Sequence, residues 1–413
     1  MKIFNKIYKQ PIEYFLALIL VYGNGSWLQL GYNLAFKVLL LFVLIFYIIV
    51  FINKKRIEQV SPIGLLIPLL LIFSTLINLS YKSNINSLLS TFCIVLIFSV
   101  LNKRSLANLL DKYAEIILGL IYLSFIVTIL KLIIPGFTGY FPNVNFDRFT
   151  HYKNLFIYVD SLRNGLSPFR VQGIFWEPGA WAVNQAIAFY WYMIYKKDYK
   201  KFYIFLASSI LTASTSGLLF TFIFSSYLFF DKIDNSLTSM IKKSILTISI
   251  FVFIVFFYAS TKYFVLIPSN GNQTGNLLSI ATRTVLFQTV EKFYPGGVSY
   301  GSNESRLETY FETFKLSKHR PLLGVGMLKY KYRPFVTSVF GELIYQCGYL
   351  FTLLWVFLFS QLFKPIPFKY AAPLIFLLLN AEAYAFGSLF ILIIVLGSKI
   401  LFNKTPLLYR TLV

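Results

Sequence analysis

Three carboxylates lie inside apolar stretches of the sequence, at Glu177, Glu342 and Glu382. A carboxylate in such a stretch is costly in free energy and usually has a function. Near positively charged groups, in a partly dry site, it can act as a general base in sugar or acyl chemistry. Glu342 and Glu177 are therefore the candidate catalytic residues. A salt bridge with Arg170 explains Glu177 equally well, and capping of an exposed turn is the better explanation for Glu382.

The arginines are unevenly distributed along the chain. Of the ten, seven fall in two long segments, 135–171 and 267–335, whereas the short basic segments use lysine almost exclusively. A guanidinium group is planar and permanently charged, and it binds phosphate oxygens in a bidentate manner. The bias therefore predicts binding of a phosphate or pyrophosphate. For any single arginine, contact with lipid headgroups or pairing with a nearby glutamate is an equally good explanation. The candidate pyrophosphate-binding residues are Arg170, Arg320, Arg163, Arg306 and Arg283.

Two short motifs accompany these residues. In the first, residues 170–179 (RVQGIFWEPG), Pro178 and Gly179 loosen a helix beside Glu177. In the second, residues 320–326 (RPLLGVG), a Gly-rich bend follows an arginine and can present backbone N–H groups to an anion. It has neither a preceding strand nor a Walker lysine, so a nucleotide loop is not supported. The polar run at 212–217 (TASTSG) is better explained by helix packing than by substrate contact.

Composition defines the class of protein. Of the 413 residues, 57% are hydrophobic and 13% are charged, against roughly 25% charged in an average soluble domain. This excludes a soluble enzyme, a nucleic-acid-binding protein and a disordered chain, and it predicts an all-α, polytopic integral membrane protein. The net charge of +22 does not indicate nucleic acid here, because the basic residues lie between apolar runs. That pattern sets membrane orientation and favours contact with anionic lipids.

A membrane-spanning helix needs about 20 mostly apolar residues. The sequence has eleven or twelve such stretches, because two short pairs could each form one hairpin. The first is interpreted as a retained anchor, not as a cleaved signal peptide. The stretches are 12–30, 33–52, 61–80, 86–101, 113–134, 172–195, 202–214, 217–230, 244–266, 336–362, 369–381 and 384–402.

The lysines set the orientation. With the N-terminus inside, the cytoplasmic loops carry groups such as Lys54, Lys103, Lys196 and Lys364, whereas the alternate short loops contain only Lys82. This is a strong positive-inside signal, and it predicts that both termini are cytoplasmic.

The chain is thus expected to be a single polytopic membrane domain, 1–413, with two large loops outside, 135–171 and 267–335. Within the second loop, 303–318 is predicted to form an amphipathic helix at the membrane surface. Under this topology the charged residues within spans gather at the outer face.

No metal or other cofactor is expected. The sequence has two cysteines, Cys93 and Cys347, both in apolar stretches, and two histidines, His151 and His319. Without a Cys/His cluster a zinc site is not predicted, and neither is a disulfide framework.

The residue 173–179 motif, the Ser/Thr run at 212–217 and the 320–326 motif after a long outside loop resemble those of the bacterial O-antigen polymerase (Wzy) and O-antigen ligase superfamily. The resemblance extends over the whole layout of spans and outside loops. It implies a metal-independent glycosyltransferase of the bacterial inner (cytoplasmic) membrane, with a glycan on undecaprenyl pyrophosphate as donor and outside arginines binding the pyrophosphate. The ligase branch has a His-Asn pair at the start of the span after the large loop. This chain has Thr337 to Glu342 there, without histidine.

This departure favours a polymerase that joins lipid-linked repeat units into an O-antigen or capsule polysaccharide. The expected partners are the lipid-linked glycans and membrane lipids, together with a chain-length regulator if one is used, and no nucleic acid. A ligase is the alternative within the enzyme class. A transporter or flippase for lipid-linked sugars is the alternative outside it, disfavoured because the halves show no repeat.

Overall fold

The structure is a computed structural model of the whole chain. The residues that it describes are 11–23, 26, scattered positions within 38–49, 62–79, 84–134, 137–146, 149–154, 158–161, 171, 173–175, 178–212, 214–232, 311–327, 338–381 and 387–402.

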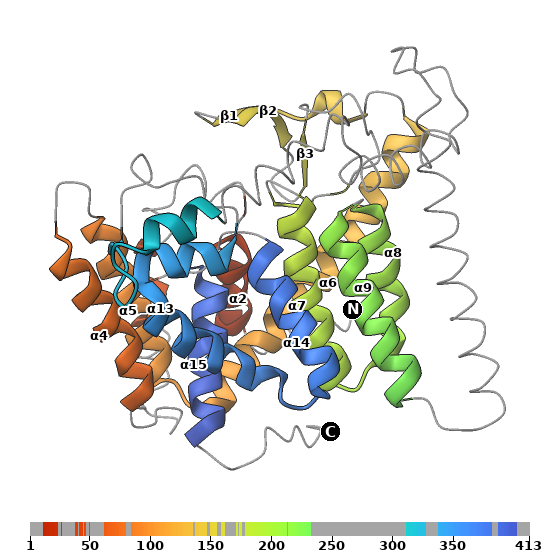
Figure 1. Ribbon diagram of the computed structural model, residues 1–413. Helices are drawn as coiled ribbons and strands as arrows, with labels where there is room; N and C mark the ends of the chain where they lie inside the picture. Colours follow the sequence, from red (N-terminus) through yellow and green to blue (C-terminus); the bar gives the residue numbers. More distant parts are fainter. Residues whose placement is uncertain are drawn as a thin grey trace.

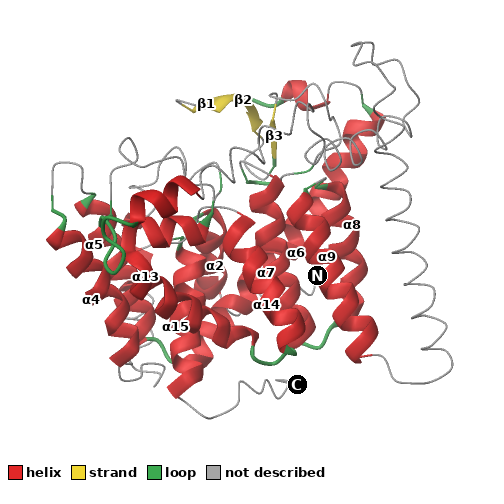
Figure 2. Cartoon of the chain, viewed as in Figure 1, coloured by secondary structure: helices red, strands yellow, loops and turns green. Residues whose placement is uncertain are grey.

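The described residues form a bundle of helices that alternate in direction along the chain (Figures 1 and 2). This confirms the expected all-α fold class. Neighbouring pairs in the bundle include α2 with α6, α6 with α7, α4 with α5, α13 with α15, and α9 with α14. The main helices are α2 (Pro11–Tyr22), α4 (Pro62–Ile77), α5 (Ile85–Val100), α6 (Lys103–Ile133), α7 (Pro178–Ile194), α8 (Phe202–Leu211), α9 (Thr215–Tyr227), α13 (Val339–Ser360), α14 (Phe368–Ala381) and α15 (Ser388–Phe402).

Short helical turns follow several of these helices. They are η2 (Phe137–Tyr140), η3 (Tyr199–Lys201), η4 (Leu228–Lys232) and η7 (Gln361–Phe363). Residues 311–317 are also helical, within the segment 303–318 that was predicted to be an amphipathic helix. Phe311 and Phe314 lie on its exposed side, whereas Thr313 and Ser317 are buried against the bundle. The two phenylalanines therefore point away from the bundle.

A small antiparallel sheet adds to the helical fold. Its strands are β1 (Asn143–Phe146), β2 (Phe149–Asn154) and β3 (Val159–Ser161), in the order β1-β2-β3. Phe146 pairs with Phe149 at the tight connection, and Lys153 pairs with both Asn143 and Asp160. The sheet lies at one end of the bundle (Figure 1), called here the sheet end. The sequence predicts a loop for this segment, so these strands are not among the predicted elements.

The helix boundaries correct two of the expected spans. The fifth, 113–134, begins ten residues earlier, so Lys103 and Lys112 belong to α6 and not to a loop. Asn102 caps this helix by accepting a hydrogen bond from the Ser105 backbone N–H at 2.8 Å. The sixth, 172–195, begins at Pro178, which suits a first helical position because proline has no N–H to donate. Span 33–52 is described only in part, and 244–266 lies outside the described residues.

Two of the described helices are long and apolar enough to cross a membrane by length and composition, Lys103–Lys131 and Val339–Phe363. At a rise of about 1.5 Å per residue, α6 is roughly 46 Å long. Helix α13 is bent inside the bundle, because Gly348 has non-helical dihedral angles.

Aromatic stacking joins the C-terminal helices. The ring centroids of Trp355 and Phe359 on α13 lie 5.2 Å apart, and those of Phe359 and Phe390 on α15 lie 5.6 Å apart. Farther along, a Cβ at Gly397 would lie 2.0 Å from the Leu358 carbonyl oxygen, so α13 and α15 approach at a point that only glycine permits.

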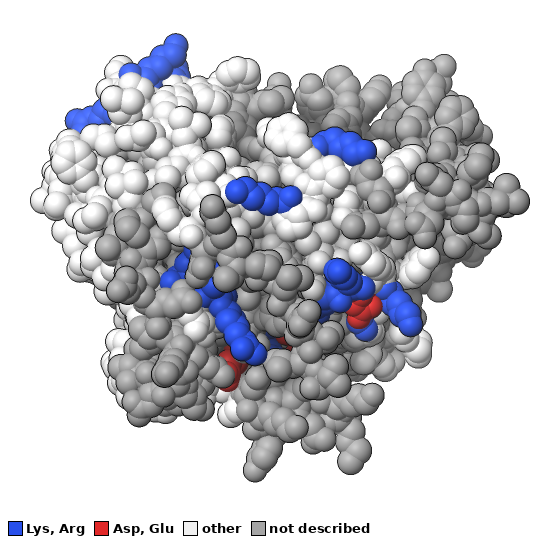
Figure 3. Space-filling view, turned by 90° about the horizontal axis from the view of Figure 1, so that it is seen from below, with Lys and Arg blue, Asp and Glu red and all other residues white. Residues whose placement is uncertain are grey.

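Basic residues collect at the end of the bundle opposite the sheet, called here the Lys-rich end. Figure 3 looks onto it and shows many Lys and Arg side chains among few acidic ones. The described residues that carry this charge are Lys103, Arg104, Lys112, Lys196, Lys197, Lys200, Lys201, Lys364, Lys369 and Lys399.

Candidate functional site

Glu342 is the one candidate catalytic residue that lies in the described part of the chain. It is in the first turn of α13, at the sheet end, and its side chain is buried, with 7% exposed. The helix begins there because Ser338 accepts a hydrogen bond from the Gly341 backbone N–H at 3.0 Å. Glu177 and Glu382 fall outside the described residues.

The Glu342 carboxylate is held by an amide on the next turn of α13. Gln346 Nε2 donates a hydrogen bond to Glu342 Oε1 at 3.0 Å. The two residues are four apart in a helix, so they share one face. Gln346 is not among the residues predicted from the sequence, although its spacing of four from Glu342 is a readable signal. The oxygen of this amide, Gln346 Oε1, is buried and accepts no hydrogen bond.

Of the five candidate arginines, Arg320 alone is described, and its side chain is exposed at the sheet end. Arg170, Arg163, Arg306 and Arg283 fall outside the described residues. Arg320 begins the segment 320–327, called here the glycine loop, which packs against the bend in α13. The structure therefore brings the start of this loop and the helix of Glu342 to the same end of the bundle.

In the Gly-rich bend, the N–H groups of Gly324, Val325 and Gly326 all donate to carbonyl oxygens, so they are not available to an anion, and this part of the prediction is wrong. The Gly324 N–H donates to the Arg320 carbonyl at 3.0 Å, which closes a tight turn. The Val325 N–H donates to the Tyr345 carbonyl at 3.1 Å, and the Gly326 N–H to the Gln346 carbonyl at 2.8 Å. The N–H groups of Val325 and Gly326 thus satisfy carbonyl oxygens that the bend in α13 would otherwise leave unpaired.

The bend and the glycine loop fit each other closely. The Tyr349 N–H donates to the Pro321 carbonyl at 2.7 Å, and a Cβ at Gly348 would lie 2.3 Å from the Leu322 carbonyl oxygen. Gly348 has a φ of 78° and Gly324 a φ of 64°, values that side chains disfavour. Glycine is needed at both positions for conformation and for space.

Helix α4 holds the other side of the glycine loop. Ser74 donates to the Leu323 carbonyl and, at 3.2 Å, to the Gln346 carbonyl. Asn78 Nδ2 donates to the Gly324 carbonyl at 3.0 Å, and Thr75 Oγ1 accepts from the Met327 N–H at 3.2 Å. The loop is therefore fixed between α4 and the segment of α13 that carries Gln346.

The other two motifs have structural contacts in the described residues. Gly173, with a φ of 58°, lies under the Trp181 ring, and Phe175 stacks on Trp181 with ring centroids 5.4 Å apart. In the polar run, Thr212 Oγ1 donates to the Ser209 carbonyl at 2.6 Å and accepts from the Ser214 N–H at 3.3 Å. These contacts support the helix-packing explanation for the 212–217 run.

A buried ion network, which the sequence analysis missed, lies near the Lys-rich end. Lys196, just after α7, lies 2.7 Å from Asp111 Oδ1 and 3.1 Å from Glu115 Oε1 on α6. Lys112 adds a second cation 3.4 Å from Glu115. Glu115, within the expected span 113–134, thus lies away from the sheet end, so the charged residues within spans do not all gather at one end. The readable signal was the spacing of Asp111 and Glu115, which puts both carboxylates on one face of α6.

Neutral groups complete this network. Trp191 Nε1 donates to Asp111 at 3.0 Å, and the Tyr14 hydroxyl donates to Glu115, which ties α2 to the pair. Burial alone would lower the pKa of Lys196, but the Asp111 and Glu115 carboxylates outweigh it and raise the pKa above its ordinary value. In the described contacts, two carboxylates on α6 meet two ammonium groups, and the network joins α2, α6 and α7.

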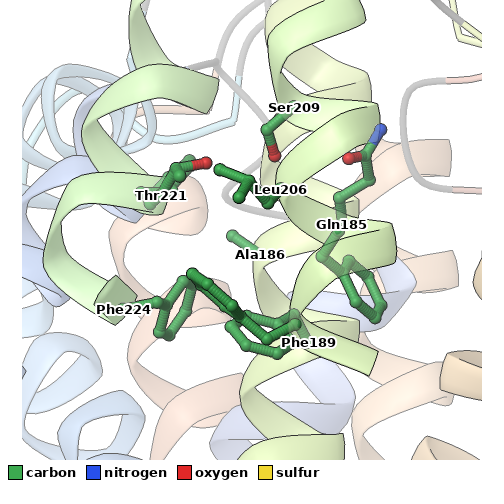
Figure 4. A pocket seen from close by; sticks show the side chains of 10 residues that line it. Gln185, Ala186, Phe189, Leu206, Ser209, Thr221 and Phe224 are labelled. Carbon is green, nitrogen blue, oxygen red and sulfur yellow. The ribbon is translucent and has the colours of Figure 1, made fainter. Parts of the chain in front are cut away.

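A pocket between α7, α8 and α9 is too small for a sugar ring. Its lining includes Gln185, Ser209 and Thr221 beside the phenylalanines Phe189 and Phe224 (Figure 4). Both polar atoms of the Gln185 amide are buried without a protein partner. The space suits about one water molecule, which is enough to hydrogen-bond such an amide. The pocket therefore has a structural explanation and is not assigned to substrate.

Among the described residues, no three His, Cys, Asp or Glu side chains are grouped as metal ligands. Cys93 is half-buried and Cys347 is buried.

Comparisons of the chain with protein-family models, with curated proteins and with solved structures find no match in any of the three.

Proposed function

We propose that the chain is a multi-pass protein of the bacterial cytoplasmic membrane that polymerises glycan repeat units carried on undecaprenyl pyrophosphate. Both termini are cytoplasmic, and the sheet end, with segments 135–171 and 267–335, faces outward. The enzyme is a glycosyltransferase of the O-antigen polymerase type and uses no metal ion. Its product is an O-antigen or capsule polysaccharide.

A membrane location is supported by the surface of the bundle. Large apolar side chains are exposed well inside the helices, among them Leu69, Ile126, Leu353 and Phe376. Such surface is rare on a soluble monomer but is suited to lipid contact. The lysines at the opposite end from the sheet have the distribution of a cytoplasmic face.

The observation that carries the catalytic proposal is the buried Glu342 carboxylate at the sheet end, on the helix against which the Arg320 loop packs. Glu342 takes the proton of an acceptor hydroxyl. The hydroxyl oxygen then forms a bond to the anomeric carbon of the lipid-linked donor. The bond from that carbon to the phosphate oxygen breaks, and undecaprenyl pyrophosphate leaves with the electron pair. Arg320, with arginines from the first outside segment, stabilises the charge on the leaving group.

Glu342→Gln tests this assignment because it preserves shape but cannot accept a proton. We expect the variant to fold and insert but to build no polymer, and Glu342→Asp to retain partial activity. Glu312→Gln on the exposed helix at the same end is the matched control and should be active. Wild-type polymer from Glu342→Gln at normal protein level would exclude Glu342 and transfer the role to Glu177.

Deletion of the gene, followed by gel analysis of surface glycan, tests the class of function. A polymerase predicts collapse of the polymer ladder to single-repeat species. Complete loss of glycan-capped lipid would instead indicate a ligase. Build-up of lipid-linked units on the cytoplasmic side would indicate a flippase, the class for which a buried ion network such as that of Asp111 and Lys196 is the favouring observation.

A further inference from the structure

The amide of Gln346 is a buried group with one half of its hydrogen bonding unused. Its nitrogen donates to Glu342, whereas its oxygen accepts no hydrogen bond although only 1% of the residue is exposed. The orientation of the amide is fixed, because an ionised carboxylate accepts hydrogen bonds and would repel the amide oxygen. A buried acceptor without a partner is unfavourable unless a water molecule or a ligand supplies a donor.

We propose that Glu342 and Gln346 together bind two neighbouring hydroxyl groups of the acceptor sugar. One hydroxyl donates to the Glu342 carboxylate and is the nucleophile, and the next one on the ring donates to Gln346 Oε1. This inference rests on the proposed function, since it gives the acceptor for which Glu342 is the base. It identifies the acceptor as a sugar with adjacent free hydroxyl groups.

The backbone geometry supports this role. The carbonyl of Gln346 accepts hydrogen bonds from the Gly326 N–H and from Ser74, so neither the bend nor the glycine loop can shift without moving this residue. The side chain is fixed from the other direction by Glu342. The amide nitrogen lies 3.0 Å from Glu342 Oε1, so the oxygen of the same amide is held close to the carboxylate. Two neighbouring acceptors of this kind can bind two neighbouring hydroxyl groups of one sugar ring.

Gln361 is a second buried glutamine of α13 and its following turn, with the same pattern of hydrogen bonding but no contact with a candidate base among the described residues. It is buried at the Lys-rich end, its Nε2 donates to the Phe357 carbonyl four residues earlier at 2.9 Å, and its Oε1 also lacks a partner. The difference is the group that accepts the hydrogen bond: a backbone carbonyl for Gln361 and the candidate base for Gln346. Gln361 is therefore a matched control for the loss of a buried amide.

The test measures binding of the acceptor sugar independently of the reaction. The full chain is reconstituted in lipid vesicles with lipid-linked repeat units extracted from cells that lack the gene. The probe is the free repeat unit, released from its lipid by mild acid and added as a competitive inhibitor. A second portion is treated with periodate, which cleaves bonds between carbons that carry adjacent hydroxyls. The inhibition constant is measured for both portions with the wild type, Gln346→Met and Gln361→Met.

We expect the untreated unit to inhibit the wild type and the periodate-treated unit to be much weaker. Gln346→Met should raise the inhibition constant of the untreated unit on the order of tenfold or more, because one hydrogen bond to a buried partner is lost. It should also reduce the preference for untreated over treated unit, whereas Gln361→Met should change neither. Gln346→Leu replaces the methionine variant if that protein does not fold.

Equal inhibition of the wild type and Gln346→Met would overturn the inference, and so would equal effects of Gln346→Met and Gln361→Met. An untreated unit that does not inhibit the wild type would overturn it as well. None of these results touches the proposed function, which depends separately on the loss of polymer in Glu342→Gln.

Discussion

The ammonium of Lys196 lies 2.7 Å from Asp111 Oδ1 and joins the end of α7 to the third turn of α6. Removing this cation by Lys196→Met leaves two buried carboxylates with Lys112 as their one remaining cation among the described contacts. Breaking a fully buried ion pair costs about 3–5 kcal/mol, and we expect less here because the Lys196 side chain is 27% exposed. Lys196→Arg should retain most of the stability, and Lys200→Met, on the exposed surface nearby, should be neutral. Thermal unfolding in detergent measures all three.

The same pair predicts a pH dependence. The raised pKa of Lys196 means that its contribution to stability is fully present below the unfolded value of about 10.4 and is lost as pH rises through the higher folded value. The difference in stability between wild type and Lys196→Met should therefore be unchanged between pH 7 and pH 9. A difference that shrinks across that range would show that the lysine loses its proton there, contrary to the observed contacts.

Gly348→Ala should disrupt the sheet end of the molecule. The new methyl group would meet the Leu322 carbonyl, and alanine disfavours a φ of 78°. We expect low yield or loss of the bend that positions Gln346. Gly119→Ala is the matched control, since nothing lies within 4 Å of a Cβ there, inside helix α6. That variant should be neutral or more stable by about 0.5–1 kcal/mol. Yield and thermal stability of the two purified proteins distinguish them.

Arg320 is predicted to bind the donor pyrophosphate through its planar fork. Arg320→Ala should abolish polymer, and Arg320→Lys should strongly reduce it, because lysine keeps the charge but cannot bind two oxygens in the same way. The same pair of changes at Arg170 should have the same effects. Lys318→Ala removes an exposed charge two residues away and should leave polymer length unchanged. Normal polymer from both lysine variants would mean that charge alone is sufficient.

The proposed topology can be tested with a matched pair of aromatic residues. Tyr140 at the sheet end is 85% exposed, and Phe368 at the Lys-rich end is 84% exposed. In a background with Cys93 and Cys347 replaced, a membrane-impermeant maleimide should label Tyr140→Cys in intact cells. Phe368→Cys should react only after permeabilisation. Labelling of both from outside would contradict the proposed orientation.

The helical class and most helix positions could be predicted from the sequence, because long apolar runs separated by lysines leave few alternatives. Glu342 could also be selected, since a lone carboxylate in an apolar run is conspicuous. The role of the 320–326 motif could not be predicted. The N–H groups of this motif donate to carbonyls beside the bend at Gly348, and polar side chains of α4 hold the motif in place. Both contacts depend on tertiary packing, which the sequence does not reveal.

The ion network shows the same limit. The i, i+4 spacing of Asp111 and Glu115 is visible in the sequence, but their partner Lys196 is 81 residues from Glu115. The sequence therefore predicts a cytoplasmic loop for this lysine. Likewise, the length and position of the segment around 143–161 predict a loop. The structure has strands there, because β1 and β2 form an antiparallel pair.

The attachment of the glycine loop to α4 also constrains how the protein is made. Ser74 meets the Leu323 carbonyl across 249 residues of sequence. During translation α4 is complete long before the ribosome reaches the glycine loop. Until then, polar side chains of α4 must use other hydrogen-bond partners, such as carbonyl groups of their own helix; these side chains are Ser74, Thr75 and Asn78. In the structure, Asn78 Nδ2 already donates to the Ser74 carbonyl at 2.7 Å. The region around Glu342 can therefore be assembled only after the glycine loop has been made, long after α4.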